Sequence, residues 1–223
     1  MDTRLLASAL AKFFLGFVIT ALLLFLPAGT FAFRNAWLLM AVLFIPMFLA
    51  GIVMLFKAPD LLRRRLKARE SQTEQKGVIA GSALLFVTSF LLAGFGFRFQ
   101  WPELSLGVCR GFALVFLLGY ALFGEVLREN EYLSRTIEVQ ADQHIVDTGL
   151  YGIVRHPMYM ATLLMFLSMP LILGSVFSFA VMLGYVPILL VRIRGEEALL
   201  ERELKGYAAY KKKVRYRLVP YLW

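Results

Sequence analysis

The segment RHPMY, residues 155–159, places two basic side chains and a proline at the start of a long apolar run. No Asp, Glu, Lys or Arg occurs from 156 to 191. Proline suits the first position of a helix, and the free N–H groups and dipole there favour an anion. The segment therefore predicts an anion-binding catalytic site or, equally well, an Arg-His pair that binds lipid phosphate.

A second polar group, RIRGEE, follows the apolar run at residues 192–197. Arg192 and Glu196 are four residues apart and therefore share one face of a helix. A simple ion pair usually explains such spacing. Acidic residues add little to topology at a membrane exit, however, so a role in a site is also open. The two histidines, His144 and His156, have no third ligand patterned near them, so we expect no metal site.

The composition excludes an ordinary soluble domain. Hydrophobic residues make up 60% of the 223-residue chain and the mean hydropathy is +0.71, whereas soluble domains are about 45–50% apolar. Charge-free runs extend over residues 13–33, 35–56 and 77–97, and a fourth run, about 104–124, carries one arginine. Each run is long enough for a helix that crosses the bilayer, which needs about 20 residues.

The final apolar run can cross the bilayer twice, as residues 158–174 and 175–191, with a turn at Gly174-Ser175. Pro170 and Pro187 predict kinks in these two short helices. We therefore predict an all-α polytopic membrane protein with about six transmembrane helices, the last two forming a hairpin. A re-entrant loop in place of that hairpin would also fit.

The basic residues predict the orientation. With the N-terminus in the cytoplasm, the cytoplasmic side receives all but three of the 24 Lys and Arg residues, namely Arg34, Arg98 and Arg110. Both termini should then be cytoplasmic. The net charge of +9 reflects topology and attraction to anionic lipids, with no nucleic acid partner.

Three polar segments should lie on the cytoplasmic side. Residues 57–77 predict a basic interfacial helix opened by Pro59, with an anchor role favoured over substrate binding. Residues 125–155 should extend the fourth helix and then become irregular. Leu200, Leu204 and Tyr207 recur at helical spacing, which predicts an amphipathic helix over about 196–213.

Taken together, these motifs resemble the isoprenylcysteine carboxyl methyltransferase family of integral-membrane enzymes, which use S-adenosylmethionine. The resemblance rests on QHIVDTGLYGIVRHPMY (143–159), then Arg192, Glu196-Glu197, the Tyr207/Tyr210 pair and Pro220. It covers residues 138–223, so residues 1–137 are predicted as an N-terminal membrane part without a recognisable motif.

The resemblance implies a site residue by residue. Arg192 corresponds to the substrate-carboxylate arginine and is the predicted catalytic and substrate-binding residue. The positions implied to bind the cofactor are Gln143, His144, Ile145, Val146, Tyr151, His156, Pro157, Met158, Tyr159 and Glu196. The family has His where this chain has Gln143, and it commonly has Gly where this chain has Ala161.

Methyl transfer from a sulfonium to a carboxylate needs no general base, because the carboxylate is already ionised. The site must supply alignment and exclude water. Arginine can hold the carboxylate and tyrosine faces attract the sulfonium. The acceptor is expected to be a prenylated or lipid-like molecule from the membrane. A phospholipid N-methyltransferase, a more distant NADPH-dependent sterol-reductase-like enzyme and a non-enzymatic scaffold are the alternatives.

Overall fold

The computed structural model describes residues 3–66, 73–130, 132, 133, 139 and 143–223. Within these residues the chain is helical, with no β-strand apart from an isolated bridge between Glu103 and Ser175. The all-α class predicted from the sequence is confirmed. The predicted boundary between residues 137 and 138, and the extension of the fourth helix to Arg135, lie outside the described residues.

The four N-terminal apolar runs form long helices, as predicted. They are α1 (Thr3–Ala28), α2 (Arg34–Lys57), α4 (Thr73–Arg98) and α5 (Leu106–Glu129). All four are long and apolar enough to cross a membrane. The helix α1 begins earlier than its charge-free run and thereby includes Lys12, whose ammonium group donates to the carbonyl oxygen of Leu66 at 2.5 Å.

The C-terminal helices fold back on each other, and the two arms differ in length. Among the described residues five helices are long and apolar enough to cross a membrane, so the predicted count of about six is not confirmed. The first arm, α6 (Pro157–Ile172), has 16 residues, and Pro157 occupies its first turn as predicted. Gly174 makes the turn with φ of +79°. The second arm consists of α7 (Val176–Met182) and α8 (Tyr185–Glu203), which together form a fifth candidate span of 28 residues. It continues past residue 191, where we predicted that it would end.

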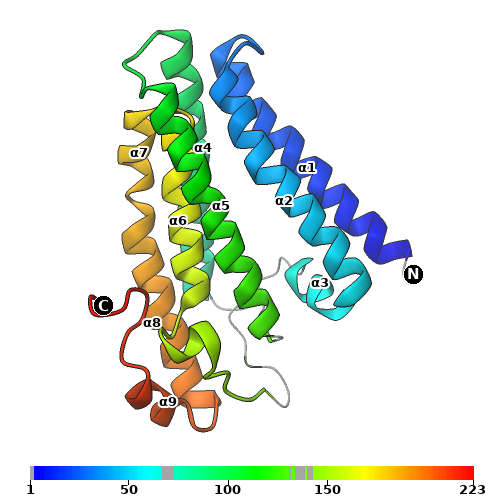
Figure 1. Ribbon diagram of the computed structural model, residues 1–223, viewed down its shortest axis with the longest axis vertical. Helices are drawn as coiled ribbons and strands as arrows, with labels where there is room; N and C mark the ends of the chain where they lie inside the picture. The colour runs from blue at the N-terminus through cyan, green and yellow to red at the C-terminus, as the bar shows by residue number, and fades with distance from the viewer. Residues whose placement is uncertain (1–2, 67–72, 131, 134–138, 140–142) are drawn as a thin grey trace.

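The predicted single tail helix over 196–213 is wrong. The helix α8 ends at Glu203 and a separate helix, α9 (Tyr207–Lys213), follows. Gly206 separates them with φ of +91°, a left-handed conformation that ends a helix and suits glycine. The turn brings α9 beside the end of α8 (Figure 1). Tyr207 and Tyr210 share a buried cluster with Leu200 of α8.

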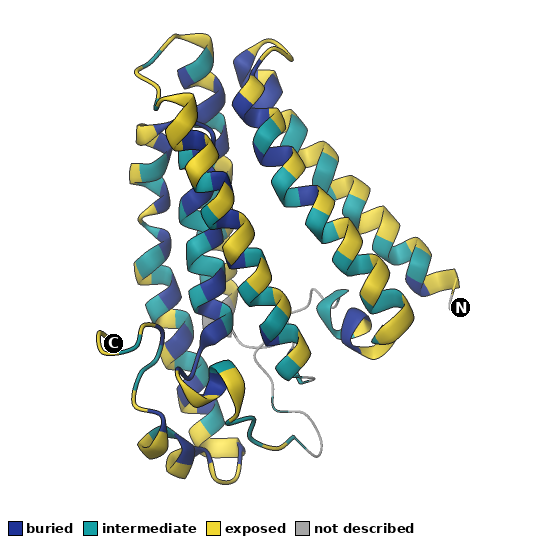
Figure 2. Cartoon of the chain, viewed as in Figure 1, coloured by how far each residue is buried: buried dark blue, intermediate teal, exposed yellow. Residues whose placement is uncertain are grey.

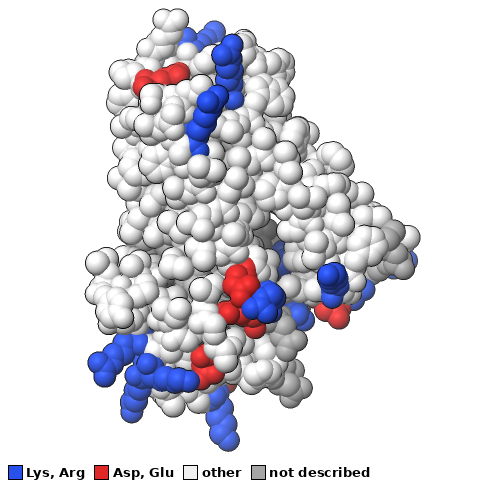
Figure 3. Space-filling model, in the orientation of Figure 1, with Lys and Arg blue, Asp and Glu red and all other residues white. Residues whose placement is uncertain are grey.

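The basic segment after α2 forms α3 (Pro59–Leu66), as predicted, with Leu61 and Leu62 buried. Figure 1 shows α1–α3 as a wing beside the bundle of α4–α8, with both chain ends in the lower half of the view. The outward faces of α1 and α2 are mainly exposed or half-buried (Figure 2). Figure 3 shows an apolar band between two charged ends, as expected of a chain surrounded by lipid.

Candidate functional site

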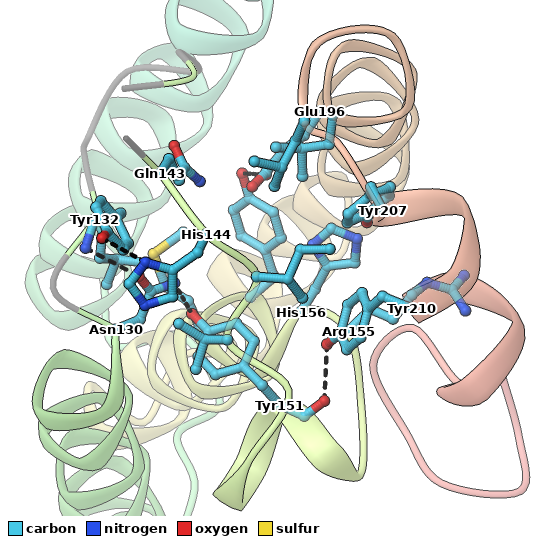
Figure 4. Close-up of a pocket in the computed structure, with 17 residues that line it drawn as sticks. Asn130, Tyr132, Gln143, His144, Tyr151, Arg155, His156, Glu196, Tyr207 and Tyr210 are labelled. Carbon is cyan, nitrogen blue, oxygen red and sulfur yellow. Dashed lines mark hydrogen bonds between the residues drawn. The ribbon is translucent and has the colours of Figure 1, made fainter. Parts of the chain in front are cut away.

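A pocket lies below the bundle, where α5 and α6 face the end of α8 and α9. It is lined by Asn130, Tyr132, Leu133, Gln143, His144, Ile145, Val146, Tyr151, Arg155, His156, Met158, Tyr159, Glu196, Leu200, Leu204, Tyr207 and Tyr210. Figure 4 shows Tyr132 and His144 on one side of this pocket and Glu196 and Tyr207 on the other. Its walls therefore come from four separate parts of the sequence.

The pocket collects almost all of the residues predicted to bind a cofactor. Pro157 is the exception, because it forms the first turn of α6 and does not line the cavity. Arg192 also lies outside the lining but is one hydrogen bond away, since its Nε donates to the Tyr159 hydroxyl at 3.1 Å. The roles of these residues stay predictions.

Tyr159 links Arg192 and Glu196 of the RIRGEE group through hydrogen bonds. Its hydroxyl accepts from Arg192 and donates to the Glu196 carboxylate, where the oxygen atoms are 2.5 Å apart. Arg192 and Glu196, which we predicted to share one face of a helix, are therefore linked through the Tyr159 hydroxyl. The Tyr159 ring lies beside the His156 ring, with centroids 5.6 Å apart. The helices α6 and α8 thus present one continuous polar wall.

Arg155, whose role the sequence left open, lines the pocket and also makes structural contacts. Its Nε donates to Oε1 of Glu197 at 2.7 Å, and both side chains are almost fully buried, with 5% and 4% exposed. His156 Nε2 lies 3.2 Å from the same oxygen, and Arg217 Nε donates to Oε2 at 3.0 Å. Such a carboxylate is retained in the interior because each oxygen has a cationic or polar partner.

The same arginine fastens the C-terminal tail to the start of α6. Its Nη1 donates to the carbonyl oxygens of Val214 and Arg215, both at 2.7 Å. The backbone N–H groups of Arg155 and His156 donate to the carbonyls of Tyr216 and Arg217. The first turn of α6 is therefore positioned by the tail as well as by its own helix.

The opposite wall includes the end of α5 and the turn at Gly149. Both Glu129 carboxylate oxygens accept from the N–H of Leu150, at 3.2 and 3.0 Å. Gly149 has φ of +51°, and a Cβ there would overlap the Glu129 carboxylate. This turn begins the 3₁₀ helix η1 (Gly149–Gly152), which directs Tyr151 into the pocket, where its hydroxyl accepts from Asn130 Nδ2 at 3.0 Å.

The hydroxyl of Tyr207 is buried and has no hydrogen-bond partner among the described residues. Burial raises the pKa of this phenol above its ordinary value, so it stays protonated and able to donate. Tyr210 differs, because its hydroxyl donates to the carbonyl oxygen of Tyr151 at 2.7 Å. Since a buried hydroxyl without a partner is costly, Tyr207 marks a place for a polar ligand atom.

Sequence reasoning missed part of this site. Asn130, Tyr132 and Leu133 follow α5 in a segment without a motif. The two tail tyrosines were part of the family pattern but were not assigned to the site. Glu197 was seen only as the neighbour of Glu196, because adjacent helical positions point in different directions and only packing decides which is buried.

A comparison with known proteins finds a family model that matches part of this chain. Residues 108–206 match the family model described as phospholipid methyltransferase. The match is to membrane methyltransferases. The resemblance predicted from the sequence is thereby confirmed, because this family includes the isoprenylcysteine-type enzymes. The matched residues run from α5 to the glycine before α9 and thus include the pocket.

The chain is also similar to a Delta(14)-sterol reductase from Mus musculus, with 31% identity over 91 residues. These residues are 40% of this chain and 22% of the reductase. The chain therefore spans about a fifth of the length of the curated relative that it matches.

Proposed function

We propose that the protein transfers a methyl group from S-adenosylmethionine to the carboxylate of a lipophilic acceptor, of the isoprenylcysteine type. The observation that carries this proposal is the Arg192–Tyr159–Glu196 chain of hydrogen bonds at the edge of the pocket. It sets a guanidinium, a group able to bind a carboxylate, next to a pocket that holds an acidic side chain, which suits a cationic methyl donor.

The pocket residues fit such a cofactor chemically. Glu196 can neutralise the cofactor amine or accept from a ribose hydroxyl, and the buried Tyr207 hydroxyl is in need of an acceptor. The start of α6 at His156 and Pro157 suits the methionine carboxylate. The bound cofactor supplies an electrophilic methyl group on sulfur.

The side chains of the protein bind and orient the acceptor. Arg192 holds the acceptor carboxylate in its planar fork, and Tyr159 fixes the orientation of the guanidinium. A carboxylate oxygen forms the new bond to the methyl carbon while the bond from that carbon to sulfur breaks, so the products are a methyl ester and the neutral thioether. No proton is transferred, and alignment with exclusion of water accounts for the rate.

Cofactor binding should enlarge the pocket. Its volume is about 100 Å³, whereas small-molecule sites usually hold about 300–1,000 Å³. Residues 143–146 line one side without belonging to a helix. We propose that this segment moves outward to admit the cofactor and then closes over it, within a catalytic part formed by residues 138–223 whose pocket faces the cytoplasm.

The purified protein can be tested with methyl-labelled S-adenosylmethionine and N-acetyl-S-farnesylcysteine. Base-labile label in the organic phase is the expected result, because a methyl ester hydrolyses in base. Calorimetry should detect binding of the cofactor, while binding of NADPH without binding of S-adenosylmethionine would contradict the proposal and favour a reductase related to the sterol enzyme.

A second candidate is methylation of a phospholipid amine, which the family match favours. An amine nucleophile must lose a proton, and Glu196 is the carboxylate in the pocket able to take it. Base-stable label in phosphatidylethanolamine, with none in the farnesylcysteine, would select this acceptor instead.

A further inference from the structure

A second cavity lies inside the membrane part, between the α1–α3 wing and α5 and α6. Its volume is about 510 Å³ and its walls are mostly apolar, with side chains such as Phe13, Met47, Phe116 and Met169. Figure 3 shows the hollow between α5 and the wing. It is separate from the pocket described above, since no residue lines both.

The end of this cavity near α3 is cationic. Lys12 and Arg65 are the charged residues that line it, and no acidic side chain is among the described lining residues. Lys12 reaches the carbonyl oxygen of Leu66, and the Arg65 guanidinium lies 5.1 Å from the centre of the Phe123 ring. The cavity therefore combines a long apolar interior with two positive charges at its α3 end.

A space of this size requires an occupant. Protein interiors are close-packed, and an apolar void forfeits the contacts of every side chain around it. In a bilayer the available filler is a hydrocarbon chain, and the two cations favour an attached anion. A glycerophospholipid carries both features in one molecule.

We propose that this cavity binds one acyl chain of a glycerophospholipid, with the lipid phosphate held near Lys12 and Arg65. On this assignment α3 is part of a lipid-binding site as well as an interfacial helix. The site goes beyond the proposed methyl transfer and does not depend on it. It is nevertheless close to that pocket, because Thr162 lines the cavity and donates to the carbonyl oxygen of Tyr159 at 3.0 Å.

The full chain can be reconstituted in vesicles that contain phosphatidylglycerol with a diazirine group in one acyl chain. After illumination, the labelled peptides are identified by mass spectrometry. The expected labels fall on the cavity faces of α2 and α5. Even labelling of all lipid-facing helices would overturn the proposal, because it indicates ordinary contact with the bilayer.

Glycine variants test the interior of the cavity. Gly51 and Gly124 line it, and a Cβ at either position meets no atom within 4 Å. Gly51→Leu and Gly124→Leu should each fill space in the cavity and reduce the labelling, because the leucine side chain and an acyl chain cannot occupy the same volume. Leucine also favours the helix over glycine, so folding should be retained.

The matched control is Gly16→Leu in α1, which has equally open space around its Cβ and does not line the cavity. It should label as the unmodified chain does. Labelling that stays unchanged in both cavity variants, with normal thermal unfolding, would overturn the proposal.

A second pair of variants tests the phosphate contact. Arg65→Gln should reduce labelling by phosphatidylglycerol several-fold and leave labelling by an uncharged diacylglycerol probe nearly unchanged. Arg63→Gln is the control, because Arg63 is on the same helix, pairs with Asp60 at 2.6 Å and does not line the cavity. Equal loss with both probes, or equal loss in both variants, would contradict the assignment of the phosphate to this end.

Discussion

The N-terminal membrane part and the C-terminal part of this chain bury different kinds of side chain. The core that α1 and α2 share with α4, α5 and α6 is apolar, built around residues such as Leu24, Leu39 and Phe116. Among the described residues, the buried ionisable side chains Arg155, His156 and Glu197 belong to the C-terminal part. The first part is specified by hydropathy. The second also has an apolar core, around Met182, Leu189 and Ile193, and adds to it hydrogen bonds with defined geometry.

This difference matters because the two kinds of interior respond differently to change. Apolar packing tolerates exchange of one hydrophobic side chain for another of similar volume. A buried ion pair does not tolerate the loss of one partner, since the remaining charge is left in the interior. The catalytic proposal is therefore concentrated in the part of the molecule that is least tolerant.

The largest expected effect is that of Glu197→Gln. Removal of the negative charge leaves Arg155 buried without its counter-ion, which should reduce the free energy of unfolding by about 3–5 kcal/mol. Thermal unfolding in detergent measures the loss. The control is Glu201→Gln, an exposed residue paired with Lys211, which should have little effect. Equal stability of the two variants would show that the C-terminal part is no more sensitive than an ordinary surface.

Arg192 and Glu196 separate catalysis from cofactor binding. Arg192→Ala should lower turnover on the order of a hundredfold, as loss of one transition-state donor does, while cofactor affinity is largely kept. Glu196→Ala should weaken binding of the cofactor. Methyl-transfer kinetics and calorimetry measure the two effects. Equal loss of cofactor affinity in both variants would contradict the proposed division of roles.

Tyr207→Phe should have opposite effects on ligand binding and on stability. Loss of the hydroxyl should weaken cofactor binding about three- to tenfold. The free protein should be at least as stable, because a buried hydroxyl without a partner is removed. Tyr210→Phe is the matched control, and it should lose stability, since its hydroxyl bonds the Tyr151 carbonyl. A cofactor affinity unchanged in Tyr207→Phe would exclude the hydroxyl as a ligand contact.

The smallest effect concerns the exposed ion pair between Asp147 and Lys213, 2.6 Å apart. The hydrogen bond from Lys213 lowers the pKa of Asp147. The pair therefore stabilises the fold above the unfolded-state pKa of about 3.9, and this contribution is lost as the pH falls through the lower folded value. Unfolding measured from pH 7 to pH 3 should show a slightly shallower acid dependence in Asp147→Asn.

The sequence predicted the membrane part closely, because bilayer thickness sets the length of each apolar run. The helices α2 and α4 begin and end within a few residues of the predicted runs. Through the family resemblance the sequence also named about half of the residues that line the pocket. The exception among the predicted cofactor-binding residues is Pro157, which forms the first turn of α6 and is buried outside the pocket lining.

The end of α8 and the identity of the buried acid could not be predicted, because both depend on tertiary packing. Leu200, Leu204 and Tyr207 had the correct helical spacing, but Gly206 allowed a turn where the pattern suggested continuity. The choice between Glu196 and Glu197 as the buried acid depends on where the tail residues Val214–Arg217 pack. No local pattern in the sequence carries that information, because the partners of Glu197 come from residues 155, 156 and 217.

The short first arm of the hairpin has a consequence for the depth of the site. With 16 residues and a rise of about 1.5 Å per residue, α6 is about 24 Å long, whereas the hydrocarbon core is roughly 30 Å thick. At least one end of α6 therefore lies inside the hydrocarbon, unless the bilayer thins around it. If that end is the first turn, a water-soluble cofactor descends below the headgroups to meet an acceptor whose chain stays in the lipid.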